Sequence, residues 1–305
     1  MPRPSDLTIR QLEYLVALAD TLGFHRAAER VHVSQPSLSA QVQQAEAVLG
    51  VRLFERSQRR VLLTPAGELV VARARRVLRE AEDLLAAARL LSDPFRGDWR
   101  LGLIPTVAPY LLPEILPGVH RAHPDLRLLL REERTPVLVR ELLAGGLEAA
   151  ILAEVPDLGT LSRAPLAEDP FLLAAPLGHP LARKRRVALR DLEQAPLLLL
   201  EDGHCLRGQA LAFCAQAGAR EADFRASSLP TLMQMVAAGL GLTLLPALCA
   251  PMERTRASLV LRPFAPPVPG RQLVLAWRGG SPLAGTLTTF AAELRAAWPG
   301  RTIPS

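Results

Sequence analysis

Three cysteines are the side chains best suited to covalent chemistry in this 305-residue chain. Cys205 follows a short apolar run, Pro196–Leu200, and a turn, and it stands at the start of a predicted helix that ends before Gly218. The free backbone N–H groups of a helix N-terminus favour a thiolate, and Arg207 and a protonated His204 could add positive charge. A thiolate attacks the O–O bond of a peroxide and becomes a sulfenic acid. The sequence therefore indicates a candidate redox site at Cys205.

Cys214 lies further along the same predicted helix and is the natural partner for a sulfenic acid on Cys205. A separation of nine residues at about 1.5 Å each spans about 13 Å, whereas the Cα atoms of a disulfide lie within about 7 Å. The helix would have to open before the bond could close, which would make this segment a two-state element. The alternative is that Cys214 and Cys249 are small buried apolar residues and that Cys205 has no special role.

The N-terminal third of the chain has the pattern of a helix-turn-helix with a wing. Apolar residues at helical spacing predict helices at 12–22 and 24–31, and a third helix runs from its cap Ser34 to Gly50. The candidate DNA-contacting residues on this third helix are Gln35, Pro36, Ser37, Ser39 and Gln43. A predicted two-stranded wing presents Arg56, Arg59 and Arg60 to phosphates, which argues against an ordinary helical domain with a glutamine-rich surface.

A long helix is predicted to begin at Pro65, with Thr64 as its cap, and to end near residue 91. Its apolar residues step by four and three, which is the spacing that suits a partner helix. The candidate dimerisation residues on this seam are Val70, Val77, Leu84 and Leu91. A dimer would match a DNA site with two half-sites. The alternative is that the helix packs against the chain's own C-terminal domain.

The C-terminal two thirds alternate strands and helices, as α/β domains do. The pattern runs from the strand at 99–105 to the strand at 148–154 and then repeats, and it includes a predicted helix at 224–240. Two doubly wound lobes with a ligand cleft between them are therefore expected. The predicted organisation is a winged helix-turn-helix DNA-binding domain at 1–64, a linker and dimerisation helix with a hinge at 65–97, and a two-lobed α/β regulatory domain at 98–305.

Composition sets the broad class. The chain is 49% hydrophobic and carries a net charge of +6, which suits a multi-domain protein and only weakly favours a nucleic-acid partner. The N-terminal segment has no apolar stretch typical of a signal peptide, so a cytoplasmic location is expected. The uncharged run at 226–252 is interrupted by prolines and glycines, so no membrane span is expected. No metal or cofactor is predicted.

Several segments resemble LysR-type transcription regulators. FHRAAERVHVSQPSLSAQVQQAE, LGVRLFER and LTPAG resemble the winged helix-turn-helix of that family, and VAAGLGLTLLP resembles a segment of its periplasmic-binding-protein-like effector domain. LIPTVAPYLLP and LEDGHCLRGQALAFC resemble the peroxide-sensing OxyR branch. Two positions depart from the pattern: Ala45 stands where the family usually has leucine, and Gly208 where the branch commonly has aspartate.

The resemblance implies a homo-oligomeric regulator, dimeric or tetrameric, that binds a double-stranded DNA operator, contacts RNA polymerase and is not an enzyme. It implies a response to hydrogen peroxide through a reversible disulfide between peroxidatic Cys205 and resolving Cys214, which refolds the sensor domain. The peroxide-binding neighbourhood that it implies comprises Thr106, Thr135, His204, Arg207 and Arg271. Two alternatives remain: a LysR-type regulator that binds a small organic effector between the lobes, and a thiol peroxidase, against which the DNA module stands. Cys249 matches no sensing position and is expected in the core.

Overall fold

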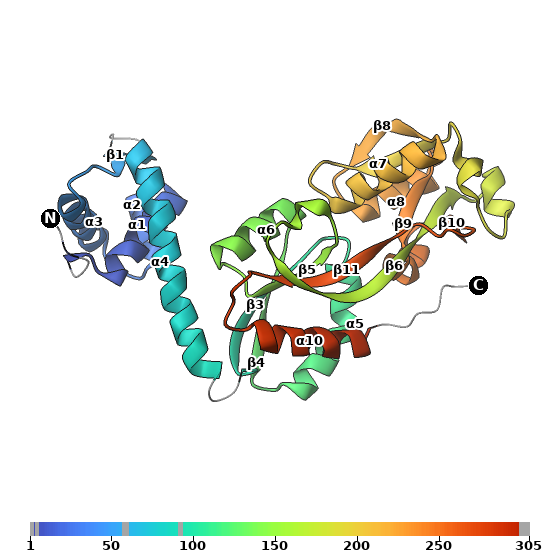
Figure 1. The fold of residues 1–305 in the computed structure, drawn as a ribbon. Helices are drawn as coiled ribbons and strands as arrows, with labels where there is room; N and C mark the ends of the chain where they lie inside the picture. The colour runs from blue at the N-terminus through green and yellow to red at the C-terminus, as the bar shows by residue number, and fades with distance from the viewer. Residues whose placement is uncertain (1–2, 4–5, 57–60, 91–93, 299–305) are drawn as a thin grey trace. The chain divides into compact units, whose positions relative to one another are not determined.

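The computed structural model describes residues 3, 6–56, 61–90 and 94–298, and within these ranges the side chains of a few residues, Arg56 and Cys214 among them, are not described. The chain divides into two compact units, Met1–Arg89 and Leu90–Ser305. Figure 1 shows the helices and strands that make up each unit. None of the helices in the described ranges is long and apolar enough to cross a membrane.

The first unit is a winged helix-turn-helix, as predicted. Its elements are α1 (Ile9–Thr21), α2 (Phe24–Arg30), α3 (Gln35–Leu49), the antiparallel pair β1 (Phe54–Arg56) and β2 (Val61–Leu63), and α4 (Pro65–Leu90). The Ser34 hydroxyl accepts a hydrogen bond from the N–H of Ser37 at 3.3 Å, and Gly50 ends α3 at a φ of 68°. The Thr64 hydroxyl caps α4 by accepting from the N–H of Gly67 at 2.9 Å. The predicted caps of α3 and α4 are thus confirmed.

One small core holds this unit together. Leu38, Val42 and Ala45 of α3 are fully buried in it, so alanine at position 45 is close-packed. Val71 and Ala74 of α4 belong to the same core. The first turns of α4 therefore pack against the winged domain itself. At this end of the helix the apolar stripe forms part of that core, so it is not available to a partner helix.

The predicted dimer seam continues along α4 beyond this core. Val77 and Leu84 are 46% and 72% exposed, whereas Val70 packs partly against the core of the winged domain. Leu91 lies outside the described residues. The dimer seam therefore stays a prediction.

The second unit has two lobes, and the first is built on a mixed sheet. Its elements are β3 (Gly97–Leu103), α5 (Ala108–Ala122), β4 (Leu126–Glu132), α6 (Thr135–Ala144), β5 (Ala149–Ala153), β11 (Gly270–Trp277) and α10 (Ala284–Ala296). Strands β4, β3 and β5 are parallel, and β11 joins β5 antiparallel. Helices α5 and α10 lie on one face of the sheet and α6 on the other (Figure 1).

The second lobe begins on a strand that both lobes share, β6 (Ser162–Pro176), which pairs first with β11 and then with β10 and β9. The other elements of this lobe are β7 (Pro196–Leu200), α7 (Cys205–Ala217), β8 (Arg220–Ala226), α8 (Leu229–Ala237), β9 (Thr243–Pro246), the short 3-10 helix η5 (Ala247–Cys249), α9 (Ala250–Arg256) and β10 (Leu259–Pro263). Through β6, strands of both lobes belong to one mixed seven-stranded sheet rather than to two separate doubly wound sheets.

One predicted helix boundary is wrong. Residues 224–226 belong to β8, and α8 begins only at Leu229 after its cap Ser228. The cause is pairing: β8 runs parallel to β7, and its side chains alternate between exposed and partly buried positions, so a tertiary contact decides the conformation.

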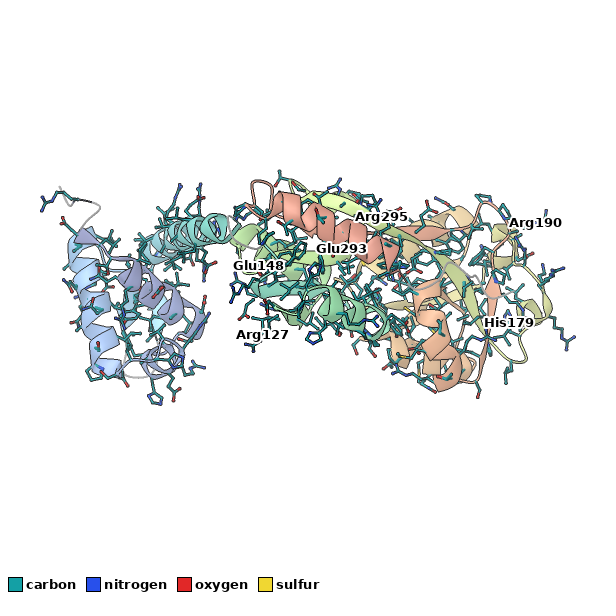
Figure 2. All side chains as sticks on the ribbon, turned by 90° about the horizontal axis from the view of Figure 1, so that it is seen from below. Arg127, Glu148, His179, Arg190, Glu293 and Arg295 are labelled. Carbon is teal, nitrogen blue, oxygen red and sulfur yellow. The ribbon has the colours of Figure 1, made fainter. Side chains whose placement is uncertain are left out.

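Each lobe has its own hydrophobic core, and several side chains pack across the boundary between them. Tyr110 of α5 is buried in the core of the second lobe. Cys205 of α7 packs against the core of the first lobe. Glu148 and Glu293, labelled in Figure 2, both belong to the first lobe, where Glu148 forms an ion pair with Arg100 at 2.6 Å.

Candidate functional site

The candidate redox site lies where the two lobes meet. Cys205 is the first residue of α7, carries a free thiol and is half-buried. The first backbone N–H groups of a helix have no partner within the helix, so this position favours a negative charge. The predicted placement of Cys205 at a helix N-terminus is confirmed.

An arginine from the first lobe holds the turn that leads into Cys205. Arg134, just before α6, donates to the carbonyl oxygen of Asp202 at 2.9 Å and to the carboxylate of Glu201 at 3.1 Å. Gly203 occupies the left-handed region at a φ of 88°, and a Cβ there would approach the Arg134 side chain at 3.1 Å. The sequence analysis missed Arg134. The only indication in the sequence is that this positively charged residue comes just before a helix.

Two buried polar atoms at this junction have no hydrogen-bond partner among the described residues: Oγ1 of Thr135 and Nε2 of His204. Burial and the Arg134 cation lower the pKa of His204, against the opposing effects of the Ser227 main chain and Glu201. The imidazole is therefore neutral near pH 7 and does not add charge to stabilise a thiolate. It can instead donate or accept one hydrogen bond, as the Thr135 hydroxyl can.

A buried ion pair forms the other side of the site. Arg271 of β11 bonds the Asp169 carboxylate of β6 at 2.9 Å, the Thr106 hydroxyl at 2.7 Å and the Thr106 carbonyl at 3.1 Å. Burial opposes the charge on Arg271, but Asp169, Cys249 and Cys205 raise its pKa above the ordinary value. The guanidinium therefore stays charged.

Asp169 was missed by the sequence analysis, although a signal for it exists. It opens an apolar strand segment, as Arg271 does in β11, and two buried strands with opposite charges at their ends predict an ion pair. Cys249 also belongs here: its Sγ donates to the carbonyl oxygen of Thr106 at 3.4 Å. Burial raises the pKa of the Cys249 thiol well above its usual value, so it stays protonated.

Arg207, expected to add positive charge beside Cys205, is paired with two carboxylates, and its role at the peroxide site stays a prediction. Its guanidinium bonds Asp202 and Glu221, each at 2.8 Å, and approaches the carbonyl oxygen of Leu200 at 3.4 Å. Its charge is neutralised by two carboxylates because the side chain turns toward β8. Arg271 and Arg134 are the other cations of this site.

Helix α7 is continuous from Cys205 to Ala217, so Cys214 is in the same helix as predicted, although its side chain lies outside the described residues. Nine residues of helix correspond to about 13 Å along the axis. Gly208 lies inside this helix at an exposed position, and a Cβ there would meet no atom within 4 Å. An aspartate at position 208 would therefore extend into open space.

The candidate DNA-reading face is the outer side of α3. Gln35, Pro36, Ser37 and Gln43 are exposed there, and Ser39 is half-buried. The side chain of Arg56 at the end of β1 is not described, and Arg59 and Arg60 lie outside the described residues. No group of three or more potential metal ligands occurs in the described part of the chain.

Comparisons with known proteins match both units. The helix-turn-helix model described as "Bacterial regulatory helix-turn-helix protein, lysR family" matches residues 9–68, and the model described as "LysR substrate binding domain" matches residues 92–299. The chain is 49% identical to a hydrogen peroxide-inducible genes activator of Dickeya chrysanthemi over 95% of each protein. It is 48% identical to the DNA-binding transcriptional dual regulator OxyR of Escherichia coli K12, over 96% of this chain and 97% of the relative.

The chain belongs to the LysR family, in its OxyR branch.

A solved structure agrees with this OxyR-branch assignment. The full-length OxyR variant from Pseudomonas aeruginosa superposes with a TM-score of 0.78 at 36% identity, and the match covers 98% of each chain. The predicted fold class, a winged helix-turn-helix followed by a two-lobed α/β regulatory domain, is confirmed. Most of α4 lies between the two matched regions of this LysR-family chain.

Proposed function

We propose that this OxyR-branch chain is a DNA-binding transcription activator that senses hydrogen peroxide by forming a reversible disulfide between Cys205 and Cys214. The observation that carries the proposal is the half-buried thiol at the start of α7, which packs against the core of the first lobe beside the unsatisfied polar atoms of Thr135 and His204. The names of relatives at 48% and 49% identity support the same activity.

The proposed chemistry starts from the Cys205 thiolate, which attacks one peroxide oxygen. The O–O bond breaks, Cys205 becomes a sulfenic acid, and the leaving hydroxide takes up a proton to form water. Thr135 and His204 have unsatisfied polar atoms that can hold the peroxide oxygens, and Arg271 with Thr106 supplies positive field. The Cys214 thiolate then attacks the sulfenic sulfur, which forms the S–S bond and releases a second hydroxide. A cellular dithiol would reduce the disulfide to the two thiols and would itself become a disulfide.

The signal is the opening of α7. Leu206, Ala210, Phe213 and Ala217 of this helix are buried in the core of the second lobe, and Phe213 meets Phe264 edge to face at 5.2 Å. The helix cannot unwind to bring the two cysteines together without disturbing this packing. Oxidation would therefore exchange one packing of the second lobe for another, as a two-state switch requires.

The DNA part of the proposal uses α3 and the wing. Gln35, Ser37, Ser39 and Gln43, with Pro36 in the first turn, would face base edges in the major groove, and Arg56, Arg59 and Arg60 would meet phosphates. Two copies joined through Val70, Val77, Leu84 and Leu91 of α4 would place two reading helices on one operator. The division into 1–64, 65–97 and 98–305 follows from these roles, and an activator would contact RNA polymerase.

The test is a footprint of the purified full chain on a DNA fragment that it binds, with and without about one equivalent of hydrogen peroxide. We expect the footprint to change in the parent protein and to stay fixed in Cys205→Ser. A parent footprint that ignores peroxide and responds to an organic effector would instead support the small-effector regulator. Continuous peroxide consumption with a thiol donor would support a thiol peroxidase.

A further inference from the structure

Two contacts join the start of α5 and the turn before it, in the first lobe, to η5 and α9 of the second. Cys249 donates from Sγ to the Thr106 carbonyl oxygen at 3.4 Å, and the Tyr110 hydroxyl donates to Oε1 of Glu253 at 2.7 Å. Thr106 and Tyr110 are four residues apart, as are Cys249 and Glu253. The two contacts, called rungs below, therefore join the same two segments, and the second lies four residues further along each segment than the first.

The first rung closes a ring of contacts around the proposed peroxide site. The N–H of Leu248 donates to Asp169 at 2.9 Å, Asp169 binds Arg271, and Arg271 donates to both oxygens of Thr106. Cys249, next to Leu248, completes the ring at Thr106. The position of Thr106 thus depends on how η5 sits against the start of α5.

The second rung, between Tyr110 and Glu253, places a buried carboxyl group where an apolar side chain could fill the same space. Glu253 is fully buried, and its Oε2 has no hydrogen-bond partner in the part of the chain that the structure describes. Its Oε1 bonds Tyr110 and lies 3.3 Å from the Arg256 guanidinium, which is half exposed. A buried carboxylate with an unsatisfied oxygen costs free energy that an apolar side chain of similar size would not. A role in packing does not account for a carboxylate here.

Tyr110 is suited to a fixed contact because it is buried in the core of the second lobe although it belongs to α5 of the first. Burial, Cys249 and the hydrogen bond to Glu253 raise the pKa of Tyr110 above its ordinary value. Its hydroxyl therefore remains a donor at any physiological pH.

We infer that the Tyr110–Glu253 contact is an inter-lobe clamp, and that Tyr110 and Glu253 are positioning residues which hold Thr106, and through it Arg271, in the geometry that accepts peroxide at Cys205. This inference rests on the proposed peroxide response. The clamp touches neither the thiol nor the peroxide. It acts by fixing the first turn of α5 against the second lobe.

The test compares two reactions of Cys205 in the full-length reduced protein, each followed by mass spectrometry of the Cys205 peptide: oxidation by hydrogen peroxide and alkylation by iodoacetamide. Tyr110→Phe removes only the hydroxyl. We expect its peroxide rate to fall roughly three- to tenfold, the value of one well-placed hydrogen bond, while the alkylation rate stays within about twofold. Alkylation needs no positioned Thr106 or Arg271, so a general loosening of the site would change both rates.

Matched variants separate positioning from folding. Tyr14→Phe removes a hydroxyl that accepts from Arg10 at 2.8 Å in the other unit, and we expect it to react like the parent. Glu253→Gln keeps an acceptor for Tyr110 and should restore most of the peroxide rate that Glu253→Ala loses. Because both changes break one contact, Tyr110→Phe with Glu253→Ala should be no slower than the slower single variant.

Each of the remaining outcomes contradicts either the proposed function or the inter-lobe clamp. A parent protein whose Cys205 does not react with peroxide contradicts the proposed function itself. A reactive parent with Tyr110→Phe at the same peroxide rate overturns the clamp. So does a variant in which peroxide and iodoacetamide rates change in equal proportion.

Discussion

The two described thiols near Arg271 have opposite surroundings. Cys205 is half-buried at the start of α7, close to a junction where Thr135 and His204 keep unsatisfied polar atoms. Cys249 is fully buried, and its thiol already donates a hydrogen bond to Thr106. Both interact with the same guanidinium. If Cys205 is the reactive thiol, as proposed, the comparison teaches that a neighbouring cation is not sufficient for reactivity, and that solvent access and unused hydrogen-bonding capacity are also needed.

The largest expected effect comes from removing the reactive thiol. Cys205→Ser should abolish the peroxide response, because no thiolate remains at the start of α7 to begin the oxidation. The measurement is peroxide-dependent transcription from a bound promoter with the purified protein. A variant that still responds would show that another thiol is the sensor, and the contrast between Cys205 and Cys249 would then not explain the response.

The next effect tests whether Arg271, the cation that the comparison invokes, is held in the core as a buried charge by Asp169. Asp169→Asn should lower the free energy of unfolding by about 3–5 kcal/mol, because it leaves the buried Arg271 charge without its partner. Urea denaturation measures it. The control is Glu154→Gln, which breaks a partly exposed pair with Arg163 and should cost about 1 kcal/mol or less. Equal costs for both variants would mean that Arg271 is not held as a buried charge.

A smaller and more selective effect is expected from removing one of the buried polar groups that have no hydrogen-bond partner in the described part of the chain. Thr135→Val removes a buried hydroxyl that has no partner among the described residues, so stability should change by less than about 1 kcal/mol. The rate of Cys205 oxidation by peroxide should nevertheless fall roughly three- to tenfold, because the hydroxyl group that would form a hydrogen bond with a peroxide oxygen is lost. The prediction fails if unfolding and oxidation are both unchanged, or if stability falls while the oxidation rate stays constant.

The smallest effect concerns the helix that must open. Gly208→Ala places a methyl group where nothing lies within 4 Å and should stabilise α7 by about 0.5–1 kcal/mol. Disulfide formation should slow by a few-fold, while the first oxidation of Cys205 keeps its rate. Stopped-flow oxidation followed by mass spectrometry separates the two steps. A faster disulfide in this variant would contradict the helix-opening step.

The sequence predicted the local features well, since caps and apolar spacing are written in neighbouring residues. Ser34, Thr64 and the start of α7 near Cys205 are examples. It failed where distant segments decide: β8 forms because β7 lies beside it, and the pairing of Arg207 with Glu221 of β8 could not be predicted from neighbouring residues.

The site was predicted in part for the same reason. Thr106 and Arg271 are 165 residues apart, and a resemblance could pair them although no local pattern does. Asp169 and Arg134 had no comparable guide, because their partners lie in other strands or in the other lobe. Buried charges of opposite sign on separate strands were the one physical signal available for Asp169.

The most direct test of the central claim is a peptide mass map of the full chain after about one equivalent of hydrogen peroxide. We predict that Cys205 is joined to Cys214, that protease cleavage within 205–217 increases because α7 has opened, and that Cys249 in the same sample remains a free thiol. Oxidation of Cys249 ahead of Cys205, or a disulfide that includes Cys249, would contradict the account.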